Sequence, residues 1–413
     1  MSVLYSLSIK IYVFAVHLAS LFDYKARKWI KGRKGWHEKL KAGTEGFEHT
    51  IWVHCASLGE FEQGRPLMEM IKEKIPGCNI LLTFFSPSGY ELRKSWPGAD
   101  YICYLPADTR QNARLFVETV KPEKAIFIKY EFWNNYITEV SIRNIPLYLI
   151  SGIFRENQHF FKWYGGFFLR MLKKFTHIFV QDISSAKILN EAGINNVTVA
   201  GDTRFDRVMK IAGSARNIPV IEEFAGNEKV LIAGSSWRKD EEIIAKYINA
   251  SPGRMKWIFA PHEINETNIA RLEGSLKTSS VRFSEFSSEK AESRVLIIDN
   301  IGMLSSAYKY AYIAGIGGGF GKGIHNILEA ACWGVPTIFG PNHKKFREAI
   351  ELLKAGGAFC FRNYHELNSI LDKLLSDSDF HSKASLTARN YVMNNTGATE
   401  KIFRSIIGND TIK

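Results

Sequence analysis

Hydrophobic residues come in short runs along most of the chain, and each run precedes a polar or glycine-containing break and a segment with helical spacing. Past residue 50, the runs that predict strands are 51–55, 80–83, 101–105, 125–128, 147–150, 178–180 and 197–200. After Asp206 the pattern starts again with 230–233, 257–260, 281–283, 295–298, 311–314 and 337–339. Strands that alternate with helices predict parallel sheets covered on both faces. We therefore expect an α/β protein with two doubly wound domains.

The restart of the pattern sets the expected domain boundaries. We expect a first Rossmann-like domain over residues 46–206, a polar linker over 207–228 and a second Rossmann-like domain over 229–413, closed by helices at 379–394 and 399–407. A length of 413 residues agrees with two domains. In doubly wound sheets ligands bind beyond the carboxyl ends of the strands, so functional residues are expected in the loops that leave the strands.

The N-terminal segment 1–22 is apolar and is interrupted by Lys10 and His17. A helix of this length would extend about 33 Å, enough to cross a bilayer core. A helix lying in the membrane interface is equally compatible with the two polar positions, and a helix buried in the protein is the third reading. Segment 23–45 holds eight basic and three acidic residues. We expect a membrane anchor helix at 1–22 and a basic juxtamembrane segment at 23–45, with the rest of the chain on the cytoplasmic side.

Composition and charge narrow the classes of function. The chain holds 54 Lys and Arg against 42 Asp and Glu, a net charge of +12 that indicates an anionic partner. The five cysteines are odd in number and show no CxxC spacing, which argues against a disulfide framework and against a zinc site. The basic segment lacks the aromatic spacing of RNA-binding motifs, so nucleic acid is not an expected partner. GxSxG, HExxH and EF-hand patterns are absent from the sequence.

A glycine-rich run at 314–323 marks the second domain, and a helix is expected to begin after it, near His325. Glycines let the backbone approach a ligand closely, and a helix N-terminus attracts phosphate, although the run also fits a plain flexible loop. Glu329 would share a helix face with His325 and Asn326, where it either binds a ribose or complements the helix dipole.

Pro261 and His262 follow the expected strand 257–260. The proline favours the first turn of a helix, which would leave His262 facing the ligand site. A purely structural histidine is the competing reading.

Three charged residues follow strands of the first domain. Ser57 and Glu60 have the spacing of a capping box, in which the carboxylate closes the start of a helix. The same carboxylate could act instead as a general base toward a bound hydroxyl. Glu131 follows strand 125–128 and Arg204 follows strand 197–200, so two carboxylates and a cation are available for proton removal and charge stabilisation.

With these residues in view, the chain resembles the transferases of 3-deoxy-D-manno-octulosonic acid (Kdo) that act in lipid A assembly. The motifs that carry the resemblance are WVHCASLGE at 52–60, YLPAD at 104–108, EFWN at 131–134, GDTRFD at 201–206 and GIHNILEAA at 323–331. The resemblance implies the GT-B fold, in which two Rossmann-like domains face a central cleft. It also implies a membrane-associated N-terminal helix and a CMP-Kdo donor, and it implies neither a metal nor a cofactor.

When the family's motifs are matched to this sequence, the resemblance implies that Glu60 is the general base. It also implies that Glu131 and Arg204 stabilise the transition state. The implied contacts to CMP are Pro261, His262, Gly302, Met303, Leu304, Asn326, Ile327, Leu328 and Glu329. This sequence has Arg204 where the family usually has lysine, and Met303 where the family usually has an acidic residue. Pro261 and His262 are adjacent here, whereas the family commonly has an arginine between them.

The resemblance predicts an inverting glycosyltransferase that moves Kdo from CMP-Kdo to a phosphorylated lipid A precursor, similar to lipid IVA, in lipopolysaccharide core biosynthesis. The expected location is the cytoplasmic side of the inner membrane. Two alternatives remain at this point: another nucleotide-sugar enzyme, such as a UDP-sugar transferase or epimerase, and a non-catalytic, membrane-tethered nucleotide-binding protein. The number of Kdo units transferred, the exact acceptor and the oligomeric state do not follow from the sequence.

Overall fold

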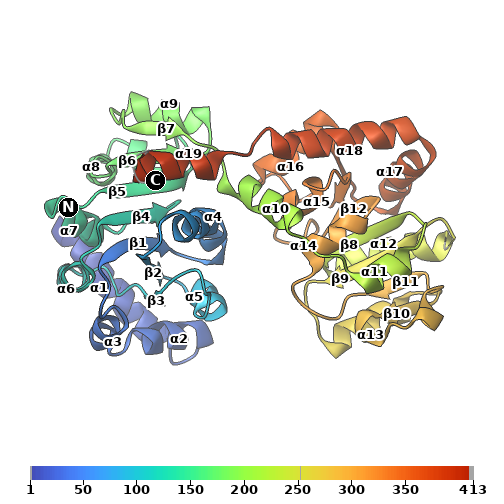
Figure 1. Ribbon diagram of the computed structural model, residues 1–413, viewed down its shortest axis with the longest axis horizontal. Coiled ribbons are helices and arrows are strands. Elements are labelled where there is room, and N and C mark those ends of the chain that lie inside the picture. The colour runs from blue at the N-terminus through green and yellow to red at the C-terminus, as the bar shows by residue number, and fades with distance from the viewer. Residues whose placement is uncertain (1, 252, 409–413) are drawn as a thin grey trace. The chain divides into compact units, whose positions relative to one another are not determined.

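A computed structural model describes residues 2–251 and 253–408. The chain forms two compact units, which are described separately. Unit 1 contains the chain up to Asp206 and again from Thr396, and unit 2 contains Arg207–Asn395 (Figure 1).

Unit 1 is built on a parallel sheet of seven strands in the order β3-β2-β1-β4-β5-β6-β7. The strands are β1 (His49–Cys55), β2 (Cys78–Phe84), β3 (Tyr101–Tyr104), β4 (Lys124–Ile128), β5 (Leu147–Gly152), β6 (His177–Val180) and β7 (Val197–Val199). The helices are α1 (Ser2–Ala19), α2 (Tyr24–Arg33), α3 (Trp36–Gly43), α4 (Leu58–Lys74), α5 (Pro87–Arg93), α6 (Arg110–Val120), α7 (Asn134–Ile142), α8 (Gly166–Leu172), α9 (Ile183–Glu191) and α19 (Ala398–Ile407).

The alternation of side chains along β1 divides unit 1 into two hydrophobic cores. Trp52 points to the face covered by α6, α7 and α8, where it packs with Phe116 and Tyr136. Ile51 and Val53 point to the opposite face, which α4 covers. Because both faces are buried, β1 reads as a nearly continuous apolar run. From β1 the strand order runs through β2 to β3 on one side and continues with β4 on the other side. The order therefore reverses between β1 and β4, and the exits of these two strands form the switch point of the sheet.

Unit 2 repeats this architecture with the strand order β10-β11-β9-β8-β12-β13-β14, also parallel. The strands are β8 (Val230–Ser236), β9 (Lys256–Pro261), β10 (Ser280–Arg282), β11 (Val295–Ile297), β12 (Ile313–Ile316), β13 (Thr337–Phe339) and β14 (Ala358–Cys360). The helices are α10 (Thr203–Gly213), which begins in unit 1, α11 (Pro219–Ala225), α12 (Arg238–Ala250), α13 (Glu266–Ser275), α14 (Leu304–Ala307), α15 (Leu328–Ala331), α16 (Arg347–Ala355), α17 (Tyr364–Ser376) and α18 (Ser378–Met393). Its switch point lies between the exits of β8 and β12.

Each run predicted to be a strand corresponds to a strand of the structure. The α/β class with two Rossmann-like parallel sheets is confirmed. Three local expectations were wrong. β14 was missed because it directly follows two glycines, which are typical of a turn. Strand 311–314 lies two residues later, at Ile313–Ile316. Pro261 ends β9 and does not begin a helix, because α13 starts only at Glu266, where Asn265 caps it.

Two expected boundaries also differ from the structure. The last helix, α19, was expected to close the second domain, but it packs on unit 1 and buries Ile402, Phe403 and Ile406 in the core beneath α4. Its N-terminus is held by the Asp206 carboxylate, which accepts from the Gly397 and Thr399 amides at 2.6 and 2.7 Å. Residues 207–228, expected as a linker, contain α11 and most of α10, because apolar residues at helical spacing continue across Asp206.

The N-terminal segment forms α1, which packs on unit 1 through Tyr5, Ile9 and Tyr12. Among residues 2–251 and 253–408, no helix combines the length and the apolarity that crossing a bilayer requires. The basic segment forms α2 and α3, which fit closely on β3: a Cβ on Gly32 would lie 2.2 Å from the Tyr104 ring.

Candidate functional site

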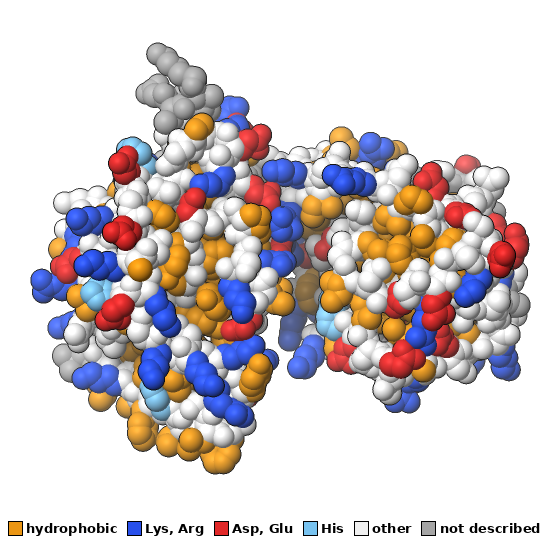
Figure 2. Space-filling model, turned by 60° about the horizontal axis from the view of Figure 1, so that its bottom comes forward, with side chains coloured by type: hydrophobic (Ala, Val, Ile, Leu, Met, Phe, Trp, Pro, Cys, Tyr) orange, Lys and Arg blue, Asp and Glu red, His pale blue; other side chains and the backbone are white. Residues whose placement is uncertain are grey.

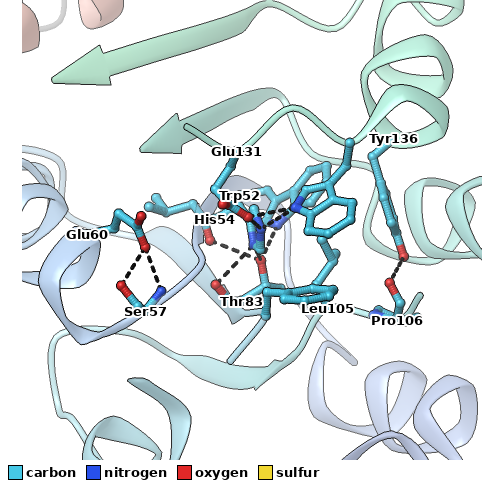
Figure 3. Close-up of polar contacts among 12 residues, drawn as sticks. Trp52, His54, Ser57, Glu60, Thr83, Leu105, Pro106, Glu131 and Tyr136 are labelled. Atoms are coloured by element: carbon cyan, nitrogen blue, oxygen red, sulfur yellow. Dashed lines mark hydrogen bonds and ion pairs between the residues drawn. The ribbon is translucent and has the colours of Figure 1, made fainter. Parts of the chain in front are cut away.

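Glu60 stands in the first turn of α4, directly beyond the exit of β1. Its Oε2 accepts hydrogen bonds from both the amide and the hydroxyl of Ser57, each at 2.7 Å (Figure 3). The capping box predicted from the sequence is therefore present. Oε1 of the half-buried carboxylate accepts no hydrogen bond within the described part of the chain. One oxygen holds the helix start while the other is available to a substrate, so capping and catalysis are compatible.

Glu131 lies beyond the exit of β4 and is 7% exposed. Its Oε2 is 2.9 Å from Nε2 of the fully buried His54 and accepts a 2.7 Å hydrogen bond from the Trp133 indole (Figure 3). On its other side, His54 Nδ1 is 2.9 Å from the hydroxyl of Thr83, which accepts from the Trp52 indole. Both nitrogens of the His54 ring therefore have partners, Thr83 on one side and Glu131 on the other. The network holds the Glu131 carboxylate in one orientation.

Arg204 occupies the first turn of α10, beyond β7. Its guanidinium contacts the buried Asp202 carboxylate through Nε at 2.8 Å and Nη2 at 2.7 Å. The neighbouring Thr203 hydroxyl donates to the Gln63 carbonyl at 2.5 Å, which ties the Arg204 loop to the helix that carries Glu60. All three predicted residues lie beyond the carboxyl ends of strands of this sheet, with Arg204 after the edge strand β7.

Asp108 is a second buried carboxylate, close to Glu131 but absent from the predicted site. It is 1% exposed and accepts from the Tyr5 hydroxyl at 2.5 Å and from the Asn135 and Tyr136 amides at 3.1 Å. Burial raises the pKa of Asp108 to about 6, against the hydrogen bonds that lower it. Since Tyr5 belongs to α1 and Asn135 to α7, Asp108 connects the N-terminal helix to the helix that follows Glu131.

The glycine-rich loop of unit 2 leaves β12 at the switch point. A Cβ on Gly317 would lie 2.0 Å from the Ser235 carbonyl, so only glycine allows the β8 and β12 exits to approach this closely. The Asp240 carboxylate joins the two exits by accepting from the Trp237 and Gly318 amides at 3.0 and 2.9 Å. A cavity of about 470 Å³ lies against this loop and is lined by Trp237, Phe320 and Lys322, among others.

His262 lies at the edge of this loop, where its ring is 4.6 Å from Trp237 and 4.5 Å from His325. The Trp237 indole donates to His325 Nε2 at 3.0 Å, so this nitrogen carries no proton. Burial, with the nearby His262, lowers the pKa of His325 to about 4 and keeps the ring neutral. The three flat rings form a wall beside the glycine loop, suited to stacking on a planar ligand.

Glu329 is held by two neighbours: Asn326 Nδ2 donates to Oε1 at 3.0 Å and the Ser305 hydroxyl donates to Oε2 at 2.6 Å. Ser305 directly follows the predicted segment 302–304, so two of the three predicted CMP-binding segments meet at Glu329. The helix expected to begin near His325 begins only at Leu328 and spans four residues. The expectation of a phosphate-binding helix N-terminus was therefore wrong, since α15 is too short to carry a substantial dipole.

Sequence reasoning missed His54, Asp108, Trp237 and Asp240. A signal was present for His54: with Thr83, it interrupts strands that are otherwise almost entirely apolar and buried. A polar residue inside such a strand must find a buried partner, so its position indicates a network. Asp108 and Asp240 gave no comparable signal, because only the fold brings their partners near: backbone amides for both and, for Asp108, also the distant Tyr5 hydroxyl.

Known proteins support one class of function. The family model described as "3-Deoxy-D-manno-octulosonic-acid transferase (kdotransferase)" matches residues 31–207. The chain is 30% identical to the 3-deoxy-D-manno-octulosonic acid transferase of Aquifex aeolicus over 344 residues, covering 81% of this chain and 89% of that protein. It is 24% identical to the Haemophilus influenzae protein of the same name, covering 85% of each.

Solved structures resemble both units. The UDP-GlcNAc 2-epimerase of Neisseria meningitidis, solved with UDP-GlcNAc, has a TM-score of 0.60 at 15% identity, covering 88% of this chain and all of that one. A glycosyltransferase from Rickettsia africae has a TM-score of 0.58 at 15% identity, with 88% and 99% coverage. These likenesses define the class by fold, as a protein with two Rossmann-like units. The sequence relationship defines it further: the chain belongs to the Kdo transferase family and is a glycosyltransferase.

Proposed function

We propose that the protein transfers Kdo from CMP-Kdo to a hydroxyl of a phosphorylated lipid A precursor, at the cytoplasmic face of the inner membrane. The observation that carries this proposal is the Glu60 carboxylate at the β1/β4 switch point, half-buried and with Oε1 open to a ligand. Relatives named for Kdo transfer support the sugar, and the fold supports a nucleotide donor. We also propose that the two units adopt the GT-B arrangement, in which two Rossmann-like domains face a central cleft.

In unit 1, Glu60 removes the proton of the acceptor hydroxyl as its oxygen attacks the anomeric carbon of Kdo. The bond from that carbon to the CMP phosphate oxygen breaks, and CMP leaves with the electron pair. Glu131, oriented by His54 and Trp133, stabilises the positive charge that develops at the sugar, and Arg204 stabilises the negative charge that develops on the departing phosphate. A capping residue is a suitable base, because the helix start fixes where its carboxylate lies.

In unit 2, CMP lies against the glycine loop and the segments 261–262, 302–304 and 326–329. Gly317 lets the two strand exits approach closely, and the rings of Trp237, His262 and His325 beside them offer a stacking surface. Glu329, fixed by Asn326 and Ser305, accepts hydrogen bonds from the ribose.

The Glu329→Ala variant is expected to bind CMP more weakly by about 1.5–3 kcal/mol, the range for a hydrogen bond to a charged group. Calorimetry with CMP measures the change. Ser305→Ala is the matched control, because it removes one hydrogen bond to Glu329 but keeps the carboxylate. Unchanged CMP affinity in Glu329→Ala would remove this residue from the donor site.

Helix α1 carries the feature that supports a membrane surface. Leu4, Leu7, Ile11, Phe14 and Leu18 recur every three or four residues and are 52–64% exposed, so they form one apolar stripe. Lys25, Arg27, Lys31, Lys34, Lys39 and Lys41 on the neighbouring helices are exposed. Figure 2 shows hydrophobic side chains at the lower margin of unit 1, with Lys and Arg side chains close to them. An apolar stripe beside basic residues suits a helix lying in an anionic membrane surface.

Arg33 is an exception among the basic residues, because it serves the fold. It is 9% exposed and donates to the carbonyls of Leu105 and Phe85, both at 2.8 Å. Its guanidinium also lies 3.8 Å from the centre of the Trp29 ring. Desolvation lowers the pKa of Arg33 to about 9. The basic segment therefore contributes both to the core of unit 1 and to the exposed surface.

Vesicle binding is expected to separate the apolar and electrostatic contributions. Phe14→Asp should weaken binding to anionic vesicles roughly tenfold or more at every salt concentration, since Phe14 no longer inserts. Lys31→Gln with Lys34→Gln should weaken binding mainly at low salt, because exposed charges are screened. Co-sedimentation with vesicles measures both. If neither variant differs from the wild type, α1 and α2 are not the membrane contact.

A panel of nucleotides in a thermal-shift assay tests the donor. The proposal predicts that CMP raises the melting temperature more than UMP or UDP does, because binding to the folded state stabilises it. A larger shift with UDP would favour the alternative of a UDP-sugar enzyme, to which the fold likeness to UDP-GlcNAc 2-epimerase gives some weight.

A further inference from the structure

The indole of Trp133, which donates to Glu131, stacks on the ring of Phe85. The two ring centres are 4.4 Å apart and the ring planes meet at 29°. Phe85 directly follows β2, and its amide donates to the Cys55 carbonyl at 3.2 Å, at the exit of β1. Because stacked aromatic rings restrict each other's orientation, the hydrogen bond from Trp133 to Glu131 depends on where Phe85 lies.

Phe85 is held in turn by the two N-terminal helices. The Tyr12 ring of α1 lies 6.1 Å from the Phe85 ring with the planes at 29°, and the Trp29 ring of α2 meets Phe85 edge-on at 5.8 Å. Trp29 also meets Tyr12 edge-on at 6.1 Å. The Arg33 guanidinium donates to the Phe85 carbonyl at 2.8 Å. A row of rings therefore runs from Tyr12 through Phe85 to Trp133.

A second contact from α1 reaches the residue that follows this tryptophan. The Tyr5 hydroxyl accepts from the Asn134 amide at 3.2 Å and donates to the buried Asp108 carboxylate at 2.5 Å. Tyr5 and Tyr12 are seven positions apart, so two turns of α1 present them on one face. Both contacts converge on the segment 131–135, immediately beyond the exit of β4.

We propose that Tyr5 and Tyr12 are positioning residues for Glu131, so that α1 supports catalysis in addition to membrane contact. The inference rests on the proposed role of Glu131 in Kdo transfer. Neither tyrosine is required to touch the substrate, because each acts through a neighbour of the carboxylate. A carboxylate stabilises a developing charge only from a fixed position, and a displacement of about 1 Å can lower the rate by about 10².

Kinetics of the full chain in detergent solution, where binding to a bilayer plays no part, tests Tyr12. With CMP-Kdo and a tetraacylated lipid A precursor, Tyr12→Leu is expected to lower kcat about three- to tenfold. KM for CMP-Kdo should stay nearly unchanged, since the proposed donor contacts lie in unit 2. Tyr12→Phe keeps the ring and should keep the wild-type kcat. Tyr24→Leu is the matched control, because it removes an exposed ring that lies beside Lys28 at the start of α2, and it should react as the wild type does. Tyr12 is itself 42% exposed, so its replacement does not threaten folding.

A double-mutant cycle with Glu131→Gln distinguishes positioning from a general loss of structure. If Tyr12 acts through Glu131, adding Tyr12→Leu to Glu131→Gln lowers kcat no further. A loss of structure unrelated to Glu131 would lower kcat by the same factor in both backgrounds. Equal losses in both backgrounds, or wild-type kcat in Tyr12→Leu, would overturn the inference.

Hydrogen exchange gives a result that does not depend on activity. Amides of the segment 131–135 should exchange at least about threefold faster in Tyr12→Leu than in the wild type, and at the wild-type rate in Tyr24→Leu. Unchanged exchange in Tyr12→Leu would overturn the inference whether or not Kdo is transferred. Faster exchange in a protein that transfers no Kdo would refute the proposed function but support the hold of α1 on this segment.

Discussion

Glu60→Gln is expected to lower turnover by roughly 10² to 10⁴, the usual contribution of general acid-base catalysis, while CMP affinity and melting temperature stay nearly unchanged. The amide oxygen of glutamine can take the place of Oε2 and accept from the Ser57 amide and hydroxyl, so the helix start is preserved. An amide cannot take up the proton of the acceptor. Steady-state kinetics with a melting curve on the same sample measures both effects.

Ser57→Ala is the control that separates capping from catalysis. It removes the hydroxyl that donates to Glu60 and should cost about 1 kcal/mol of stability, but the carboxylate remains. Most of the turnover should survive. A Glu60→Gln enzyme that keeps wild-type turnover, alongside a Ser57→Ala enzyme that loses both stability and rate, would make Glu60 a capping residue only. Glu131 would then be the next candidate for the base.

Asp108→Ala is expected to lower the free energy of unfolding by about 2–4 kcal/mol, because the Tyr5 hydroxyl and the Asn135 and Tyr136 amides lose their acceptor inside the protein. The loss is smaller than the sum of three hydrogen bonds, since the cost of burying a charge disappears as well. Denaturant titration measures it. Tyr5→Phe, which removes one of the three donors, should fall between this variant and the wild type.

The effect of Asp108 on stability should depend on pH. Its pKa is raised to about 6, so between its ordinary value near 4 and pH 6 the folded protein holds a proton that the unfolded chain releases. The contribution of this group is therefore fully present below about pH 4 and is lost as the pH rises through 6. Asp108→Ala should cost more stability at pH 5 than at pH 8. A cost that rises from pH 5 to pH 8 would show that the carboxylate is not held in its protonated form by burial.

The sequence was informative where local pattern determines structure. Strands buried on both faces appear as short apolar runs, which is why β1, β4 and β8 were located, and Ser57 with Glu60 has a spacing that belongs to helix starts. The sequence was uninformative where distant segments meet. The hydrogen bonds from Tyr5 to Asp108 and from Thr203 to Gln63 join residues more than 100 positions apart, and no local pattern records them.

The same distinction explains the errors in the expected elements. Helix α19 was assigned to the second domain because it follows that domain in sequence, but its apolar face fits α4 and Asp206 caps it. The helix after the glycine loop was expected three residues too early. Asn326 Oδ1 accepts from the Leu328 amide at 3.2 Å and so competes with an earlier helical turn.

The central claim is tested most directly by incubating the purified full chain with freshly generated CMP-Kdo and a tetraacylated lipid A precursor, and by following the lipid by mass spectrometry. The account predicts that the lipid gains the mass of Kdo, that CMP is released in equal amount, and that Glu60→Gln suppresses both. Absence of Kdo-bearing lipid, with a wild-type protein that is folded and binds CMP, would contradict it.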